Sequence, residues 1–221
     1  MNHGHNPIRQ VDIPPVPRNE LLCNHSMVIS LPESKQSRLE PFLQQNTFDG
    51  SLDIIEAING ELLPPNRRLK AGTYGCLLSH LKAVCAAQQK GYPCVLIQED
   101  DARQVPDFNN KLKEAMLELP KNWDCLWLGG LDQRKPFPYS AKLNRLGATW
   151  GAFGYILRDT TYDLFIRLLN KRDKECDNVY KGEQATLMAF KTVEPLILHN
   201  STQSDRTFIN SKCVSQKSQL Y

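Results

Sequence analysis

One short run of the chain, residues 94–98 (Cys-Val-Leu-Ile-Gln), is apolar almost throughout. A strand with apolar side chains on both sides is typical of a central position in a sheet that helices cover on both faces. A segment with helical spacing of apolar residues, about residues 73–90, precedes this run, and another, capped by Asp107, follows it. The pattern predicts an α/β layer fold with a largely parallel sheet.

The same alternation of short apolar runs and helical stretches continues on both sides. We expect a helix from Ser34, carrying Leu39 and Phe42, and a loop over residues 130–147. The further expected strands and helices are strands 27–31, 52–58, 125–129, 150–157 and 192–199 and helices 108–119, 159–170 and 183–190.

The 221 residues suffice for one α/β domain whose core needs no disulfide. We place this domain at residues 26–205, after a Pro-rich extended or disordered leader (1–25) and before a polar tail (206–221). The net charge of +3 is slight, so it does not indicate binding to nucleic acid or to a membrane surface.

The seven cysteines are odd in number and form no CxxC pair. Several, such as Cys76, Cys85 and Cys125, lie within apolar runs, and we interpret them as reduced core residues. No run reaches the ~18 apolar residues of a membrane span, and the first 20 residues lack the apolar stretch of a signal peptide. We therefore expect a cytoplasmic protein without a transmembrane segment.

Glu99, Asp100 and Asp101 follow directly after the buried run. Adjacent carboxylates raise each other's pKa, and a divalent cation removes that penalty. Oxygen ligands suit Mg²⁺ or Mn²⁺. Continued strand geometry would turn Glu99 and Asp101 to one side and Asp100 to the other. The alternative is that all three are solvated loop acids.

The segment from Gly72 to His80 strengthens the metal hypothesis. Gly72 and Gly75 permit close backbone approach, and the start of a helix offers unpaired N–H groups to an anion. A diphosphate ligand needs both a cation and nearby donors, which these two segments together would supply. Taken alone, His80 is more typical of a structural histidine at the edge of the core.

These residues also carry a family resemblance. Residues 75–80 (GCLLSH), followed by residues 95–102 (VLIQEDDA), resemble the signature of glycosyltransferase family 25, which includes bacterial lipooligosaccharide galactosyltransferases and procollagen galactosyltransferases. Further similar segments follow in the same order, namely residues 28–32 with Arg38, residues 58–60, 123–129 and 150–155, and Ser204-Asp205.

The resemblance implies a GT-A fold, a UDP-sugar donor carrying galactose or glucose, a Mn²⁺ or Mg²⁺ cofactor, and inversion at the anomeric carbon. Asp101 would coordinate the metal, and Glu99 would hold the ribose or a metal-bound water. His199, at the end of the last expected strand, is a further candidate metal ligand or diphosphate contact, although a histidine at a strand end is more often structural. The expected donor-binding residues are Leu31, Arg38, Asn59, Gly75, Ser79, His80, Glu99 and Asp100.

Inversion also needs a base beside the acceptor hydroxyl. Glu183, at the start of the expected helix 183–190, resembles the position of a family acid and is the first candidate. Asp177, in the preceding loop, is the second. An acid in a first helical turn also favours the helix dipole without any chemical role.

Two other classes of function remain open at this stage. Clustered carboxylates also hold metals in phosphoesterases and nucleases, and the same fold could bind a nucleotide or a glycan without turnover. The acceptor is undetermined, since a glycan, a protein hydroxyl, a lipid-linked sugar and a modified base all fit. Turnover of a UDP-sugar, its acceleration by an acceptor, and phosphodiester cleavage would separate these readings.

Overall fold

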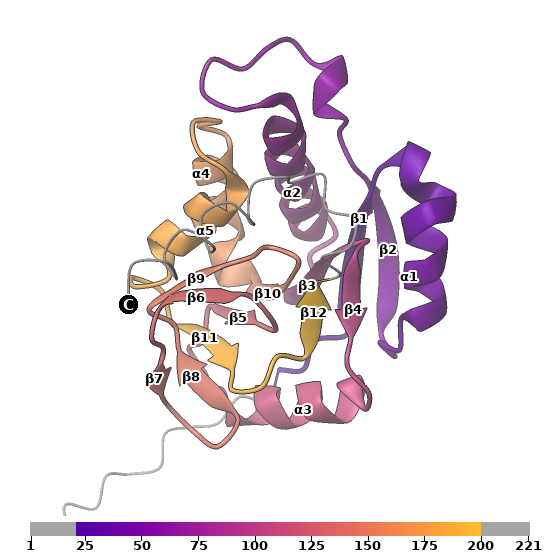
Figure 1. Ribbon diagram of the computed structural model, residues 1–221. Coiled ribbons are helices and arrows are strands. Elements are labelled where there is room, and N and C mark those ends of the chain that lie inside the picture. Colours follow the sequence, from indigo (N-terminus) through magenta and orange to yellow (C-terminus); the bar gives the residue numbers. More distant parts are fainter. Residues whose placement is uncertain (1–20, 200–221) are drawn as a thin grey trace, which may run out of the picture.

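The computed structural model describes residues 21–199, so most of the expected leader, the polar tail and the Ser204-Asp205 pair lie outside the described residues. Its centre is an eight-stranded sheet in the order β2-β1-β3-β10-β5-β11-β8-β7 (Figure 1). These strands are β1 (His25–Ser30), β2 (Ser51–Glu56), β3 (Cys94–Glu99), β5 (Cys125–Trp127), β7 (Phe137–Pro138), β8 (Leu143–Arg145), β10 (Gly154–Arg158) and β11 (Ala189–Thr192).

Two small two-stranded sheets accompany the large one. The first pairs β4 (Ala102–Gln104) with β12 (Ile197–His199), and the second pairs β6 (Leu131–Arg134) with β9 (Ala148–Trp150). The helices are α1 (Glu40–Gln45), α2 (Ala71–Gln89), α3 (Phe108–Glu118), α4 (Tyr162–Leu169) and α5 (Cys176–Glu183), with short 3₁₀ or π turns η1 (Pro32–Ser34), η2 (Lys35–Leu39), η3 (Gly60–Leu62) and η4 (Asp159–Thr161).

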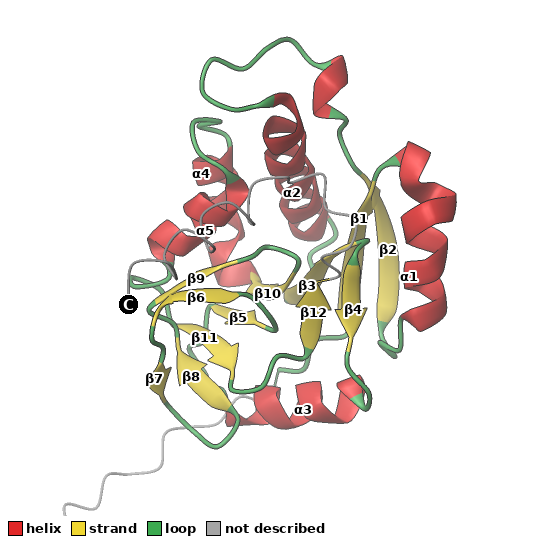
Figure 2. Cartoon of the chain, viewed as in Figure 1, coloured by secondary structure: helices red, strands yellow, loops and turns green. Residues whose placement is uncertain are grey.

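The expected α/β fold class is confirmed. The large sheet is mixed but mostly parallel, because only β10 and β8 run against the other strands. Helices cover it on both faces, with α2, α4 and α5 on one side and α3 on the other (Figure 2). β3 lies between β1 and β10, and the four residues Val95 to Gln98 are fully buried.

The two cores follow the alternation of side chains along the strands. Met27 and Ile29 of β1 belong to the core beneath α2, α4 and α5. Val28, between them, belongs to the opposite core with Phe108 of α3. Cys23, which precedes the predicted domain boundary at residue 26, is also buried in this second core.

Several expected elements are corrected. The expected loop 130–147 contains β6, β7 and β8, and the expected strand 150–157 is divided into β9 and β10 around Gly151, whose φ is 109°. The expected helix 183–190 is wrong, because α5 ends at Glu183 and Ala189 begins β11. β11 pairs with β5 and β8, so non-local pairing outweighs the local helical pattern there. The expected strand 192–199 shortens to β12.

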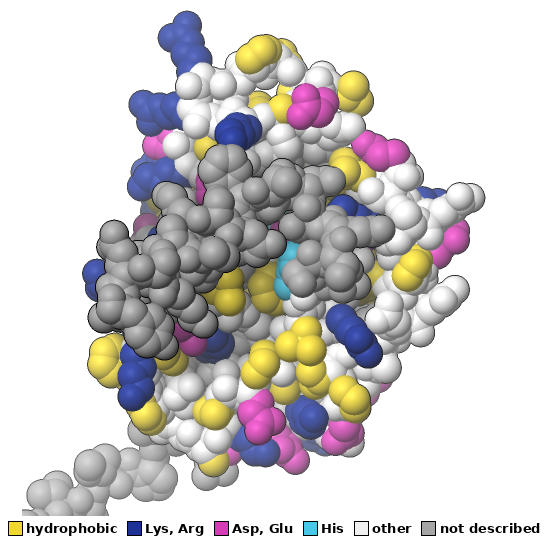
Figure 3. Space-filling view, viewed as in Figure 1, with side chains coloured by type: hydrophobic (Ala, Val, Ile, Leu, Met, Phe, Trp, Pro, Cys, Tyr) yellow, Lys and Arg dark blue, Asp and Glu magenta, His cyan; other side chains and the backbone are white. Residues whose placement is uncertain are grey.

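Charge is distributed unevenly over the surface. On the face drawn in Figure 3, Lys and Arg side chains gather along the upper left edge, and elsewhere they are scattered.

Among residues 21–199, no helix combines the length and the apolar character needed to cross a membrane.

Candidate metal and donor site

The acids at the carboxyl end of β3 meet a histidine from a distant part of the chain. Glu99 is the last residue of β3, and Asp101 lies in the turn that leads into β4. β12 pairs antiparallel with β4 so that His199 lies opposite Ala102. Ligand atoms of Glu99, Asp101 and His199 all lie within 4.8 Å of one another. The pairing of β4 with β12 therefore assembles a group of three potential metal ligands.

The carboxylate of Asp101 fits the metal that the resemblance implies. Asp101 Oδ2 lies 3.3 Å from His199 Nε2. Asp101 Oδ1 is buried and has no hydrogen-bond partner among the described residues. A buried carboxylate oxygen without a partner is costly, and a bound cation would compensate for it. Two carboxylates and one imidazole form a donor set suited to Mn²⁺.

Asp100 turns away from this group, towards β1 and η2. Ser30 Oγ donates a hydrogen bond of 2.7 Å to Asp100 Oδ2, and Arg38 lies 3.9 Å from its other oxygen. Burial raises the pKa of Asp100 to about 6, although the Ser30 hydrogen bond and Arg38 both act to lower it. A small cavity of about 70 Å³ beside it is also lined by Asp101 and Arg103. Arg38 and Asp100 thus lie together beside the other two acids, Glu99 and Asp101.

Glu99 is held from the side of α2. Its Oε1 lies 3.2 Å from His80 Nε2 and 3.9 Å from Cys76 Sγ. His80 Nδ1 lies 2.7 Å from the hydroxyl of Tyr155, which is 2.8 Å from that of Tyr180. Burial alone would lower the pKa of His80, but its hydrogen bonds with Cys76 and Glu99 raise it to about 10. The raised pKa favours the imidazolium form, and its Nε2 lies within hydrogen-bonding distance of Glu99.

The glycine-rich start of α2 packs against the loop that precedes η3. α2 begins at Ala71 rather than Thr73, which places His80 in its third turn. A Cβ on Gly75 would lie 2.4 Å from the carbonyl oxygen of Ile58 and 2.6 Å from the nitrogen of Gly60. The chain's own loop therefore makes a close backbone approach at Gly75, and contact of Gly75 with a donor stays a prediction.

Three other predicted donor-binding residues lie in or against the loops that follow β1 and β2. Ser79 Oγ accepts from Ile58 N–H at 2.8 Å and donates to the carbonyl of Gly75 at 2.7 Å, so its hydroxyl braces the loop. Asn59 caps η3 and donates to Glu33 at 2.6 Å. Leu31 caps η1 directly after β1. Contact of these residues with a donor stays a prediction.

The two candidate bases lie at opposite ends of α5. Asp177 is in its first turn and not in a loop, and Glu183 is its last residue and not the start of a helix. The carbonyl of Glu183 accepts from Thr186 and Leu187 in the turn that follows the helix. Six residues of helix separate the two acids by about 9 Å along its axis.

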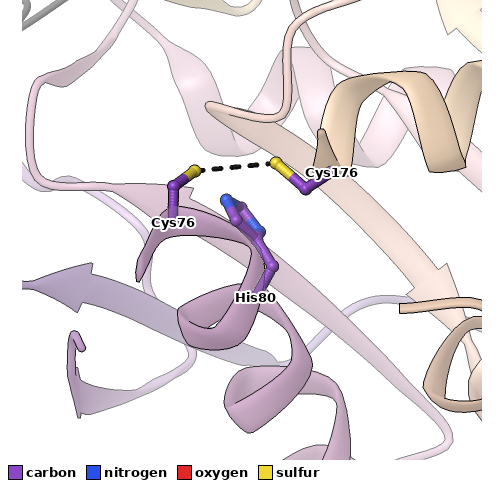
Figure 4. A group of neighbouring side chains, drawn as sticks. All are labelled: Cys76, His80 and Cys176. Carbon is purple, nitrogen blue, oxygen red and sulfur yellow. Dashed lines mark hydrogen bonds between the residues drawn. The ribbon is translucent and has the colours of Figure 1, made fainter. Parts of the chain in front are cut away.

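A second group of potential metal ligands was missed by the sequence reasoning. Cys76, His80 and Cys176 gather where α2 meets the start of α5 (Figure 4). The Sγ atoms of the two cysteines lie 3.6 Å apart. Cys76 and His80 are four residues apart on one helix face, a signal that could have been noticed. Cys176, a hundred residues further on, carries no such signal.

No protein-family model matches the chain, and no curated protein is significantly similar to it in sequence. Structural similarity extends to glycosyltransferases. One, involved in the glycosylation of the major capsid of PBCV-1, shares 11% identity over 83% of this chain and 95% of its own, with a TM-score of 0.49. GlyE of Streptococcus pneumoniae shares 10% identity over 90% of this chain and 61% of its own, with a TM-score of 0.43.

A third similar structure is a Drosophila β-1,4-galactosyltransferase 7 variant in complex with manganese, UDP-Gal and xylobiose. It shares 10% identity over 89% of this chain and 82% of its own, with a TM-score of 0.34. At these identities and TM-scores the similarity is a distant likeness of fold.

Proposed function

We propose that this protein is a metal-dependent, inverting glycosyltransferase of the family 25 type, which moves galactose or glucose from a UDP-sugar to a hydroxyl acceptor. The observation that carries the proposal is the group of Glu99, Asp101 and His199 at the carboxyl end of β3. Ligands of open α/β sheets bind at this end of the strands. The unsatisfied Oδ1 of Asp101 supports a cation there, and the sequence resemblance supports the donor class.

In this proposal Glu99, Asp101 and His199 hold Mn²⁺ or Mg²⁺, which would neutralise charge on the departing diphosphate. His80 fixes the orientation of Glu99. The acceptor oxygen bonds to the anomeric carbon, and the bond from that carbon to the diphosphate breaks. A carboxylate on the opposite side receives the hydroxyl proton.

We propose Asp177 as that carboxylate, ahead of Glu183. The neighbouring Cys176 contacts Cys76, which contacts Glu99, so the first turn of α5 lies close to the acids. The resemblance alone favoured Glu183, which lies at the far end of the same helix.

The first prediction concerns ligand binding. UDP together with Mn²⁺ should raise the melting temperature, because a ligand that binds only the native state stabilises it by mass action. At a hundred times its dissociation constant the ligand contributes about 2.7 kcal/mol, which corresponds to roughly 5–10 °C for a chain of this size. UDP with a chelator should produce a much smaller shift in differential scanning calorimetry. Equal shifts with and without the metal would contradict the proposed role of the acids.

The second prediction separates the two candidate bases. Asp177→Asn should reduce transfer to an acceptor by about 10²-fold or more, because the hydroxyl proton loses its receiver. The thermal shift with UDP and Mn²⁺ should persist, since the base does not touch the diphosphate. Glu183→Gln, the matched variant on the same helix, should retain most of the transfer rate. The opposite pattern, with both variants folded, would assign the base to Glu183.

The phosphoesterase alternative is favoured by one observation. His199 reaches the acids from another strand, and metallophosphoesterase sites commonly draw their ligands from several segments. Product analysis distinguishes the two reactions. A glycosyltransferase releases UDP from a UDP-sugar faster when acceptor is present, whereas a phosphoesterase cleaves simple phosphodiesters without one.

A further inference from the structure

The cluster of Cys76, His80 and Cys176 stands beside the carboxylate site but differs from it in chemistry. His80 and Cys176 are each 1% exposed, and Cys76 is partly exposed. Two thiols and an imidazole are the ligands that zinc prefers in proteins, whereas Mg²⁺ and Mn²⁺ prefer oxygen. The two clusters would therefore select different ions.

The separation of the two sulfur atoms fits a tetrahedral zinc site. Zn–S, Zn–N and Zn–O bonds in a tetrahedral site imply ligand–ligand separations of roughly 3.4–3.8 Å. The two Sγ atoms are 3.6 Å apart. Glu99 Oε1 lies 3.2 Å from His80 Nε2 and 3.9 Å from Cys76 Sγ. The sulfur–sulfur distance lies within this range, and the ligand atoms of Cys76, His80 and Cys176 all lie within 4.8 Å of one another.

The surroundings of His80 complete the arrangement. Histidines that bind a metal through one ring nitrogen almost always hydrogen-bond through the other, which fixes the tautomer and the ring orientation. His80 Nδ1 is bonded to the Tyr155 hydroxyl at 2.7 Å, and Tyr180 supports that hydroxyl in turn. Nε2 is thereby directed towards Glu99 and the two thiols.

We propose that Cys76, His80 and Cys176 form a second cation site, specific for zinc-type ions, with three protein ligands and a fourth position open to a water molecule. Binding displaces the proton on His80 Nε2 and the thiol protons to solvent. The ion joins α2 to the first residue of α5. If the proposed function holds, it also fixes the position of Asp177 next to Cys176, but the site itself does not depend on that function.

Cobalt(II) is the probe for this site, because thiolate coordination to Co²⁺ gives an intense charge-transfer band that oxygen ligands do not give. The full chain, freed of metal with a chelator and kept reduced with a phosphine, should develop this band and saturate at one equivalent of Co²⁺. Zn²⁺ should then abolish the band by displacement. Absence of a charge-transfer band in the reduced, folded protein would overturn the proposal.

Single substitutions test whether the charge-transfer band arises from the two cysteines of the cluster. Cys76→Ser and Cys176→Ser should each weaken the band and lower the affinity for Zn²⁺ by about 10²-fold or more, since a structural thiolate is lost. Cys85→Ser, on the same helix and also partly buried, should leave both unchanged. Asp101→Asn should retain the band even though it removes the effect of UDP and Mn²⁺, so the failure of one proposal is distinguishable from that of the other.

Two measurements on the wild-type chain test the proposal even if the cysteine variants fail to fold. X-ray absorption at the zinc edge, with one equivalent bound, should require two sulfur ligands, and a shell of nitrogen and oxygen alone would overturn the proposal. Mass spectrometry without reductant tests the competing arrangement, a Cys76–Cys176 disulfide. A cross-link between these two residues, combined with no cobalt band after reduction, would assign the pair to thiol–disulfide chemistry instead.

Discussion

Asp101→Asn should reduce sugar transfer at saturating Mn²⁺ by about 10³-fold or more. The amide retains the size of the side chain but loses the charge that holds a hard cation, so departure of the diphosphate loses its main electrostatic stabilisation. The thermal shift with UDP and Mn²⁺ should disappear in the same variant. Initial rates with a radiolabelled UDP-sugar, together with calorimetry, measure both effects.

The stability of the metal-free variant distinguishes a metal ligand from an acid with a structural role. Removing one of three neighbouring carboxylates relieves repulsion, while the 3.3 Å contact with His199 is weakened. These effects oppose each other, and we expect the free energy of unfolding to change by less than about 1 kcal/mol. Asp49→Asn, in an exposed turn before β2, is the matched control and should leave transfer unchanged. Normal activity in folded Asp101→Asn protein would remove Asp101 from the metal site.

Gly75→Ala should destabilise the protein by about 3 kcal/mol or more, which is the range of overpacking against atoms that cannot yield. The added Cβ would lie 2.4 Å and 2.6 Å from two backbone atoms, the oxygen of Ile58 and the nitrogen of Gly60. Relief requires α2 and η3 to separate, which would break the bond from Ile58 N–H to Ser79. The melting temperature should fall by roughly 6–12 °C.

Gly72→Ala is the control on the same helix, because nothing lies within 4 Å of its added Cβ. Alanine has the higher helix propensity, so this variant should be neutral or slightly more stable. If both variants lost the same stability, the effect would come from the helix backbone and not from the packing of α2 against the loop.

The parts of the fold that were predicted correctly depend on local sequence. Strand β3 and helix α3 were expected within one residue of their observed ends, since burial on both faces and a helical stripe are visible in short windows. The expected helix over residues 183–190 failed because Ala189 to Thr192 are fixed by pairing with β5 and β8. Those partners lie far away in the chain, and no local pattern contains them.

For the candidate site as well, local sequence predicted some features and not others. The acid triplet at the end of a buried strand, and the opposite orientation of Asp100, follow from strand geometry and were accessible from the sequence. The proposed ranking of Asp177 ahead of Glu183 was not accessible from the sequence, because the proposal depends on where α5 begins and which end of it contacts α2.

By itself, the sequence determined the α/β class, the buried strand β3 and the acids that end it, because each depends on residues adjacent in the chain. The sequence offered His199 as a candidate ligand, and the tertiary structure places it with Glu99 and Asp101 through the pairing of β12 with β4. The tertiary structure also decided that Cys176 meets Cys76. Contacts between distant segments depend on the burial and pairing of whole elements. The residues next to each contact in the chain therefore do not predict which distant residue they will meet.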